Sequence, residues 1–267
     1  MHRARRESST HFFEELMVRA NVIFLIAGLT MVACSSSTSD AGDASGDAGA
    51  VDSGIDDSTN PLPGCPRDPG PEVMDFDPTS VADPIGDLST FTMEKALAGY
   101  PKSGGVLTAL ITTDLGPIRC ELDEAAAPMS VANFVGLARG TRPFKFSGAW
   151  RLQRFYDGLL WHRIVPGSVI VSGDPTGTGN GGPGYMLRSE NRVAESLGTL
   201  ATSEMVMPSG SQFHIVVGDG VPAKFNVFGK CDTATALAIA ALPRTEADRP
   251  LKDVHIRRVH IARCPKK

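Results

Sequence analysis

The stretch FYDGLLWHRIVPG, residues 155–167, decides the fold of this chain. Its apolar run over residues 160–164 is strand-like, and Pro166-Gly167 at its end is typical of a tight turn. A second apolar run begins immediately afterwards, over residues 169–171. Short strands joined by tight turns are typical of antiparallel sheets, so we predict two short strands here.

The same pattern extends on both sides of this stretch. Apolar residues alternate over residues 107–122 around Asp114-Leu115-Gly116-Pro117, which predicts a β-hairpin. Ser130 suits the N-cap of a helix that ends at Gly140, and a second helix is predicted over residues 233–242. Many short strands, two helices and glycine-rich turns predict a mainly β fold, a closed barrel capped by helices. Further strand-like runs lie at residues 213–217, 225–228 and 254–262.

The composition fits one globular domain with additional segments. Of the 267 residues, 42% are hydrophobic and 21% are charged, which excludes a fibrous, a wholly disordered or a polytopic membrane protein. The net charge of −4 is unevenly spread, since residues 60–267 carry 22 basic and 21 acidic residues. A nearly neutral body lacks the basic field that attracts phosphate backbones, so no nucleic-acid partner is expected.

An apolar stretch of 14 residues, ANVIFLIAGLTMVA at 20–33, directly precedes Cys34. It is shorter than the roughly 20 residues that a membrane-spanning helix needs, and it fits the apolar core of a signal peptide. Residues 31–34 (MVAC) resemble a bacterial lipoprotein processing site, in which the cysteine is acylated. We therefore predict lipidation of Cys34; the alternative is an ordinary signal peptide followed by an unmodified cysteine.

The residues after Cys34 are nearly all small or acidic. Of the 25 residues at 35–59, 23 are Ser, Thr, Asp, Ala or Gly, which predicts a flexible acidic tether. We divide the chain into a signal peptide (1–33), a lipidated cysteine with a disordered linker (34–63), an N-terminal extension (64–104) and a barrel domain (105–267). The expected location is the cell envelope, with an exported body anchored to a membrane and facing the periplasm or the exterior.

Four cysteines follow Cys34, an even number in a chain predicted to be exported: Cys65, Cys120, Cys231 and Cys264. One or two disulfides are expected in that compartment, and three complete pairings are open. Cys65 could attach the N-terminal extension to the body. The alternative for Cys120 and Cys264 is that they are buried as small apolar residues.

Residues 177–182 (GTGNGG) match the dinucleotide-binding pattern G-x-G-x-x-G. Pro183 and Gly184 follow where a helix would have to begin, so no helix N-terminus is available to hold a pyrophosphate. We therefore reject a nucleotide cofactor and predict a long glycine-rich turn.

Several motifs together resemble the cyclophilin-type peptidyl-prolyl isomerases. Residues 155–167, 173–179 (GDPTGTG) and 182–185 (GPGY) resemble the central block of that family. Matches in the same order lie at Ala127-Pro128, residues 131–134, residues 210–213 and residues 227–230. The resemblance covers residues 105–264, so residues 105–267 form a cyclophilin-like domain. It implies an eight-stranded antiparallel barrel with a helix at each end.

The resemblance also implies the site residues. Arg163 matches the catalytic arginine, His162 its neighbour, and Gln212 the glutamine that binds the peptide backbone. Rotation about an Xaa-Pro bond breaks amide resonance, and a guanidinium that donates to the proline nitrogen stabilises the twisted state. This chemistry needs no metal, cofactor or nucleophile. The alternatives are that Arg163 is a surface strand residue and His162 a packed strand residue.

The proline pocket departs from the family pattern. Ser168 and Val169 replace an aromatic residue and Met, Val171 replaces a glutamine that orients the arginine, and His214 replaces a pocket phenylalanine. Losing one large apolar wall costs roughly 1–3 kcal/mol of ring binding, so a shallow, wetter pocket is predicted. Residues 201–204 replace an Ala-Asn segment that contacts the peptide. The predicted substrate-binding residues are Ser168, Val169, Val171, Phe213, His214, Val221 and Phe225.

Two functional classes therefore stay open. The first is an isomerase of Xaa-Pro bonds in exported proteins, with reduced or altered activity. The second is a non-catalytic module of the cyclophilin fold that binds peptides or proteins at the cell envelope. We predict the first, because neighbouring groups cannot easily replace the electrostatic role of Arg163. The expected partners are proline-containing segments of exported proteins and a membrane reached through the lipid anchor, with the protein acting as a monomer.

Overall fold

The computed structural model describes residues 62–66, 68, 91–100, 104–191, 193–203, 209–219 and 225–266. The predicted signal peptide, Cys34 and the tether up to residue 61 lie outside these described residues. So does Val221 of the predicted pocket. In the described ranges, no helix has the length and apolar character needed to cross a membrane.

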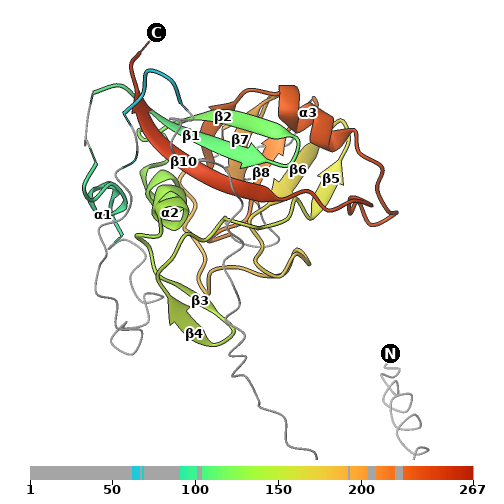
Figure 1. Ribbon diagram of the computed structural model, residues 1–267, viewed down its shortest axis with the longest axis horizontal. Coiled ribbons are helices and arrows are strands. Elements are labelled where there is room, and N and C mark those ends of the chain that lie inside the picture. The colour runs from blue at the N-terminus through green and yellow to red at the C-terminus, as the bar shows by residue number, and fades with distance from the viewer. Residues whose placement is uncertain are drawn as a thin grey trace, which may run out of the picture. The chain divides into compact units, whose positions relative to one another are not determined.

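Eight strands of the described chain form one antiparallel sheet, in the order β10-β1-β2-β9-β7-β8-β6-β5 (Figure 1). The predicted hairpin over residues 107–122 is confirmed by β1 and β2, which turn at Asp114-Leu115. A separate two-stranded hairpin, β3 (Phe144–Phe146) and β4 (Ala149–Arg151), projects from this body. The strands of the sheet are β1 (Val106–Thr113), β2 (Gly116–Leu122), β5 (Arg163–Val165), β6 (Val169–Ser172), β7 (Thr199–Thr202), β8 (Phe213–Val216), β9 (Val227–Cys231) and β10 (Ile256–Cys264).

The sheet curls almost into a closed barrel. Its edge strands β5 and β10 form no ladder of their own; the segments just before them meet instead. Leu160 forms an isolated antiparallel bridge with His255, and the backbone N–H of Ile256 donates to the carbonyl of Leu159 at 2.7 Å. The predicted closed barrel is therefore approximate. The predicted strand at residues 160–164 begins later, at Arg163, because the residues before it bridge this seam.

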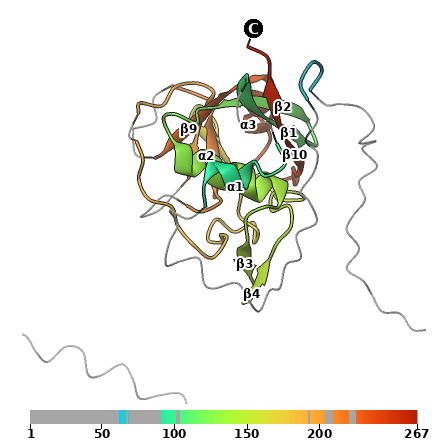
Figure 2. The same ribbon diagram turned by 90° about the vertical axis from the view of Figure 1, so that its left-hand side faces the viewer.

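Helices α2 (Pro128–Arg139) and α3 (Ala234–Ala240) lie at opposite ends of the curled sheet, as Figures 1 and 2 show. Helix α2 ends at Gly140 as predicted, in a left-handed C-cap with φ of 78°. The predicted N-cap at Ser130 is wrong, because the helix begins at Pro128 and its N-cap position is Ala127, three residues before Ser130. Instead the carboxylate of Glu190 accepts from the backbone N–H groups of Met129 and Ser130, at 2.6 and 2.8 Å.

The core lies between α2 and the inner face of the sheet. Phe134 of α2 packs against the rings of Tyr156, Phe213 and Phe228, with centroids 5.0 to 5.5 Å apart, and all four side chains are buried. Burying one such side chain contributes roughly 1.5–3 kcal/mol, so this cluster fixes the strands against the helix. The strands held in this way present a second face, which points away from the core; on β5, β6 and β8 we call it the outer face.

Two disulfides join the four cysteines of the body, Cys65 to Cys264 and Cys120 to Cys231. The alternative that Cys120 and Cys264 are unpaired is thus wrong, whereas the expected attachment of the extension through Cys65 is confirmed. Each disulfide typically contributes about 2–4 kcal/mol to stability. The extension makes further contacts through the buried Arg139 of α2, which donates to Asp68 and to the carbonyl of Ala96 in α1 (Met93–Ala96).

Candidate functional site

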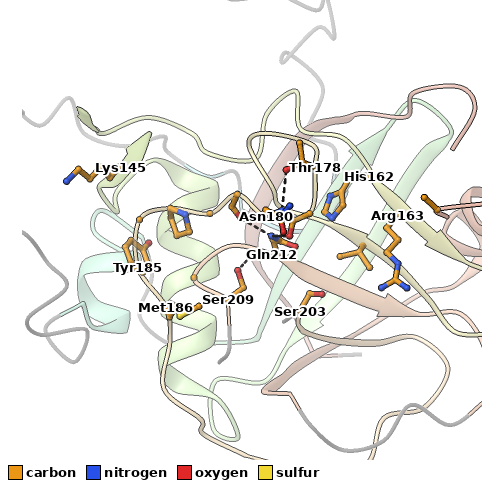
Figure 3. Close-up of a pocket in the computed structure, with 18 residues that line it drawn as sticks. Lys145, His162, Arg163, Thr178, Asn180, Tyr185, Met186, Ser203, Ser209 and Gln212 are labelled. Carbon is orange, nitrogen blue, oxygen red and sulfur yellow. Dashed lines mark hydrogen bonds between the residues drawn. The ribbon is translucent and has the colours of Figure 1, made fainter. Parts of the chain in front are cut away.

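A cavity of about 850 Å³ opens beside β5, β6 and the start of β8. Its walls are Arg163, Val171 and Gln212 on the sheet side and the glycine-rich segment 178–186 on the other. Figure 3 shows Arg163 at one end and Lys145, from the β3–β4 hairpin, at the other. Of the predicted site residues, the structure thus brings Arg163, His162, Val171 and Gln212 together around one cavity.

Arg163 lies at the first position of β5, with 55% of its side chain exposed. Its strand partner is Val171 of β6, which in turn lies opposite His214 of β8. Residues directly opposite in a sheet point to the same face, so these three side chains form a row across the outer face. The side chain of Val171 is a hydrocarbon and can form no hydrogen bond with the guanidinium. The Nη2 of Arg163 instead lies 3.4 Å from Oδ2 of Asp248.

His162 lines the cavity beside the arginine but is itself 8% exposed. Burial lowers the pKa of its imidazole, and the nearby carboxylate of Asp174 opposes this shift only in part. Its Nδ1 has no hydrogen-bond partner among the described residues. Since its ordinary pKa of 6.5 is already below neutrality, the ring is uncharged at pH 7, so the positive charge that His162 and Arg163 offer the cavity comes from Arg163.

Gln212 lies just before β8 and points into the cavity (Figure 3). Its Nε2 donates to the carbonyl oxygens of Gly179 and Gly181, at 2.9 and 2.8 Å. These two bonds use both N–H groups of the amide, so the oxygen Oε1 is left to accept a hydrogen bond from a bound peptide. Gln212 therefore has the geometry of a backbone-binding residue.

The glycine-rich segment is organised by Asp174, which sequence reasoning did not single out. Its carboxylate accepts from the backbone N–H of Thr176 at 2.7 Å and of Thr178 at 3.0 Å. Burial raises the pKa of this carboxyl, but hydrogen bonds from Thr176 and from the amides of Gly181 and Gly179 outweigh it and lower the pKa. A Cβ at Gly181 would lie 2.0 Å from Asp174 Oδ1, so this position requires glycine. The available signal was an aspartate followed closely by Thr and Gly, typical of local turns.

The far wall of the cavity is tied to α2 and to the extension. The hydroxyl of Tyr185 donates to Oδ1 of Asn133 at 3.0 Å, and Nδ2 of Asn133 donates to the carbonyl of Gly210 at 2.7 Å. The guanidinium of Arg142 stacks over the Tyr185 ring at 4.4 Å and over Phe91 at 4.7 Å. These contacts hold the wall in one position before a ligand arrives.

Of the remaining predicted pocket residues, those that the structure describes do not line this cavity. Ser168 and Val169 are half-exposed around the start of β6, and Phe225 is half-buried before β9. Phe213 points inward, where it packs against Phe134 in the core, because it alternates with Gln212 and His214 along the strand. Val221 lies outside the described residues.

His214 forms a buried pair with Glu195, which sequence reasoning also missed. Its Nε2 lies 2.6 Å from Glu195 Oε2, and the two side chains are 3% and 0% exposed. The Phe225 ring lies edge-on to the imidazole at 5.2 Å, and Oε1 of Glu195 has no hydrogen-bond partner in the described chain. Where the resemblance implied an apolar pocket wall, the outer face thus carries a polar pair. No local pattern links these residues, which lie 19 positions apart.

The geometry suits binding of an extended peptide, with a charged donor at Arg163 and an acceptor at Gln212. Among the described residues, no group of three or more His, Cys, Asp or Glu side chains could hold a metal ion. The chemistry that these groups can supply is electrostatic: a guanidinium donates to an atom that gains electron density as a bound amide twists.

Comparison with known proteins agrees with this arrangement. The family model described as "Cyclophilin type peptidyl-prolyl cis-trans isomerase/CLD" matches residues 108–261. Peptidyl-prolyl cis-trans isomerase A of Mycobacterium tuberculosis is 35% identical over 167 residues, covering 58% of this chain and 92% of that protein. Peptidyl-prolyl cis-trans isomerase B of Streptomyces anulatus is 36% identical over 168 residues, covering 57% and 95%.

Solved structures show the same fold. A cyclophilin-type peptidyl-prolyl cis-trans isomerase of Cryptosporidium parvum superimposes with a TM-score of 0.50 at 23% identity, covering 58% of this chain and 97% of that one. A second structure of it, determined in the presence of the dipeptide Ala-Pro, gives the same TM-score at 24% identity. With the family model matching more than half of its length, this chain belongs to the cyclophilin-type peptidyl-prolyl cis-trans isomerase family.

Proposed function

We propose that this protein isomerises Xaa-Pro bonds in exported proteins while it is tethered to a membrane of the cell envelope through Cys34. The observation that carries the proposal is the placement of an exposed guanidinium, Arg163, and a backbone-binding amide, Gln212, on one cavity. Proline-containing segments of unfolded exported proteins are the substrates that such an open groove would accept.

The proposed mechanism follows from amide chemistry. Rotation about the Xaa-Pro bond has a barrier of about 18–20 kcal/mol, because it breaks the resonance of the amide. In the twisted state the proline nitrogen regains a lone pair, to which the Arg163 guanidinium donates. Gln212 Oε1 accepts an N–H of the peptide and keeps the rest of the substrate still. Because the lone pair exists only in the twisted state, the arginine stabilises that state more than the planar one.

The same geometry supports a reduced activity. Val171 gives Arg163 no hydrogen bond, and buried His214 with its Glu195 partner offers the proline ring no large apolar surface. Losing such a surface weakens ring binding by roughly 1–3 kcal/mol. We therefore expect a higher KM for short peptides than an aromatic pocket would give.

Three features support export and anchoring. The 14-residue apolar stretch ends in small residues before Cys34, as a lipoprotein signal does. The acidic stretch at 35–59 gives a tethered body room to move. Both pairs of cysteines in the body are disulfide-bonded, which fits an oxidising compartment.

The deciding experiment measures cis-trans exchange of a short Ala-Pro peptide by NMR exchange spectroscopy in the presence of the full chain. Removing an electrostatic donor of this kind costs about 10²–10³ in rate, so Arg163→Ala should abolish most of the acceleration. Arg257→Ala is the matched control, because this arginine of β10 is similarly exposed and is paired with an aspartate, Asp114 of the β1–β2 turn. Unchanged exchange in Arg163→Ala would contradict the mechanism.

A second candidate function is a binding module without catalysis, which the buried His214–Glu195 pair favours. Folded protein that binds the peptide but leaves its exchange rate unchanged would support it. Location is tested separately, by labelling the protein with a palmitate analogue in a bacterial host. Label that is lost in Cys34→Ser would support the anchor, and label that persists would contradict it.

A further inference from the structure

Arg163 lies on a cavity wall without a polar neighbour on its own sheet. Its strand partner Val171 is apolar, and the next residue in the row, His214, is buried with Glu195. An exposed arginine side chain with no partner samples many rotamers. A hydrogen bond that holds it in one rotamer must offset the conformational entropy that the side chain loses. Some other group must therefore hold the guanidinium if it is to meet a substrate in one orientation.

That group comes from the loop between α3 and β10. Oδ2 of Asp248 lies 3.4 Å from Nη2 of Arg163, while Oδ1 lies 3.3 Å from Nε of Arg244. The preceding residue, Ala247, lines the cavity, so the loop reaches the edge of the site. Asp248 is 25% exposed at its side chain, less than half as much as the arginine it contacts.

The backbone fixes Asp248 beside the arginine. Its carbonyl accepts from the N–H of Ile164, the residue after Arg163, at 2.7 Å, and its own N–H donates to Thr245 at 3.1 Å. Its φ is 62°, one of two positive values at non-glycine residues in the described chain. Backbone strain of this kind concentrates at functional sites, where the surrounding structure maintains it. Here the strained residue is the one that contacts Arg163.

We propose that Asp248 is a positioning residue for Arg163: its carboxylate holds one edge of the guanidinium, so that the remaining N–H groups face the bound prolyl peptide. The inference rests on the proposed function, which assigns catalysis to Arg163. A guanidinium carries five N–H donors, so one bond to Asp248 leaves others for the substrate. Asp248 would thereby supply from a loop the support that Val171 cannot supply from the neighbouring strand.

The test compares kcat and KM of the full chain with those of Asp248→Asn. Asparagine also tolerates positive φ, so this variant removes the charge and keeps the turn. Because an exposed ion pair is a weak contact, we expect kcat to fall about 3- to 10-fold with KM nearly unchanged. Asp248→Glu should recover part of the loss. Asp253→Asn is the control: it breaks a 3.2 Å pair with Arg249 in the same loop and should leave kcat unchanged.

Two further variants separate positioning from a general structural role. In an Arg163→Ala background, Asp248→Asn should cause no additional loss. Val171→Gln places a carboxamide directly opposite Arg163 in the sheet and should restore the kcat of Asp248→Asn. The proposal is overturned by wild-type or higher kcat in Asp248→Asn, or by an equal loss in both backgrounds.

A readout that does not depend on activity keeps this test apart from that of the proposed function. NMR relaxation of the Arg163 Nε–Hε group should show a rigid side chain in the wild type and a mobile one in Asp248→Asn. Equal mobility in both would contradict the positioning role, even for an active enzyme. A wild type without Arg163-dependent isomerisation would contradict the proposed function, while the relaxation data would still decide whether Asp248 orders the arginine.

Discussion

Gln212 and His214 are two residues apart on the same outer face of the barrel, yet one side chain lines the cavity and the other is buried. Gln212 lines the open cavity and is held by two backbone carbonyls of the glycine-rich segment. His214 is buried and is held by the side chain of Glu195. The wall that would bind a peptide backbone therefore keeps its hydrogen-bonding geometry, whereas the surface expected to hold the proline ring has become a polar pair.

This difference shows which part of the site tolerates change. A backbone-binding amide must match the fixed spacing of peptide groups, so its position is constrained by geometry. A ring-binding surface needs only shape and apolar area, and it can be rebuilt if the buried polar atoms find partners. His214 and Glu195 meet that condition for each other, although Oε1 of Glu195 has no partner among the described residues.

The largest expected effect comes from breaking the buried pair. His214→Leu leaves the Glu195 carboxylate without its partner in the interior, so the free energy of unfolding should fall by about 3–5 kcal/mol. The double variant His214→Phe with Glu195→Leu removes both polar groups and should be as stable as the wild type or more so. Urea unfolding of each variant gives these values.

An exposed pair of the same chemistry is the control for that comparison. His255 Nδ1 lies 3.0 Å from Asp114 Oδ2 at the surface, and His255→Leu should cost no more than about 1 kcal/mol. Similar losses in His214→Leu and His255→Leu would mean that burial adds nothing to the His214–Glu195 pair.

A smaller effect is expected at the other residue of the comparison. Gln212→Leu loses both bonds to the glycine-rich segment and the acceptor for the peptide, so kcat/KM should fall about tenfold, mainly through KM. Steady-state kinetics of the wild type and of Gln212→Leu on one series of peptides measures this change in kcat and KM. Gln153→Leu, at an exposed position, is the control and should match the wild type. A loss confined to kcat would mean that Gln212 acts on the twisted state rather than on peptide binding.

Sequence patterns predicted those parts of the fold that depend on near neighbours. The hairpin around Asp114 and the helix end at Gly140 follow from local alternation and from one glycine with positive φ. The start of α2 did not follow, because Glu190 caps it from 60 residues away and Ser130 only looked like a cap. The disulfide pairing was open for the same reason: Cys120 and Cys231 become opposite residues only once β2 pairs with β9.

The site divides in the same way. Arg163, His162 and Gln212 lie in contiguous motifs, and the structure places all three on one cavity. The long-range partners could not be predicted, because Asp248 contacts Arg163 from 85 positions away and Glu195 contacts His214 from 19 positions away. Sequence motifs preserve the groups that would touch a substrate, while the groups that hold them depend on tertiary contacts that no short pattern encodes.

The smallest expected effect concerns pH and tests whether the open wall also contains a buried titratable group. Burial lowers the pKa of His162 below its ordinary 6.5, so the unfolded chain binds a proton at this residue more readily than the folded protein does. The contribution of His162 to the free energy of unfolding is therefore at its maximum above pH 6.5. This contribution is lost as the pH falls from 6.5 toward the lower pKa that the imidazole has in the folded state. Asp174, whose pKa is also lowered, stays ionised in this range and contributes nothing to the loss. His162→Gln should flatten the profile of melting temperature against pH below 6.5. A steep profile in His162→Gln would show that the buried imidazole beside Arg163 is not what resists protonation.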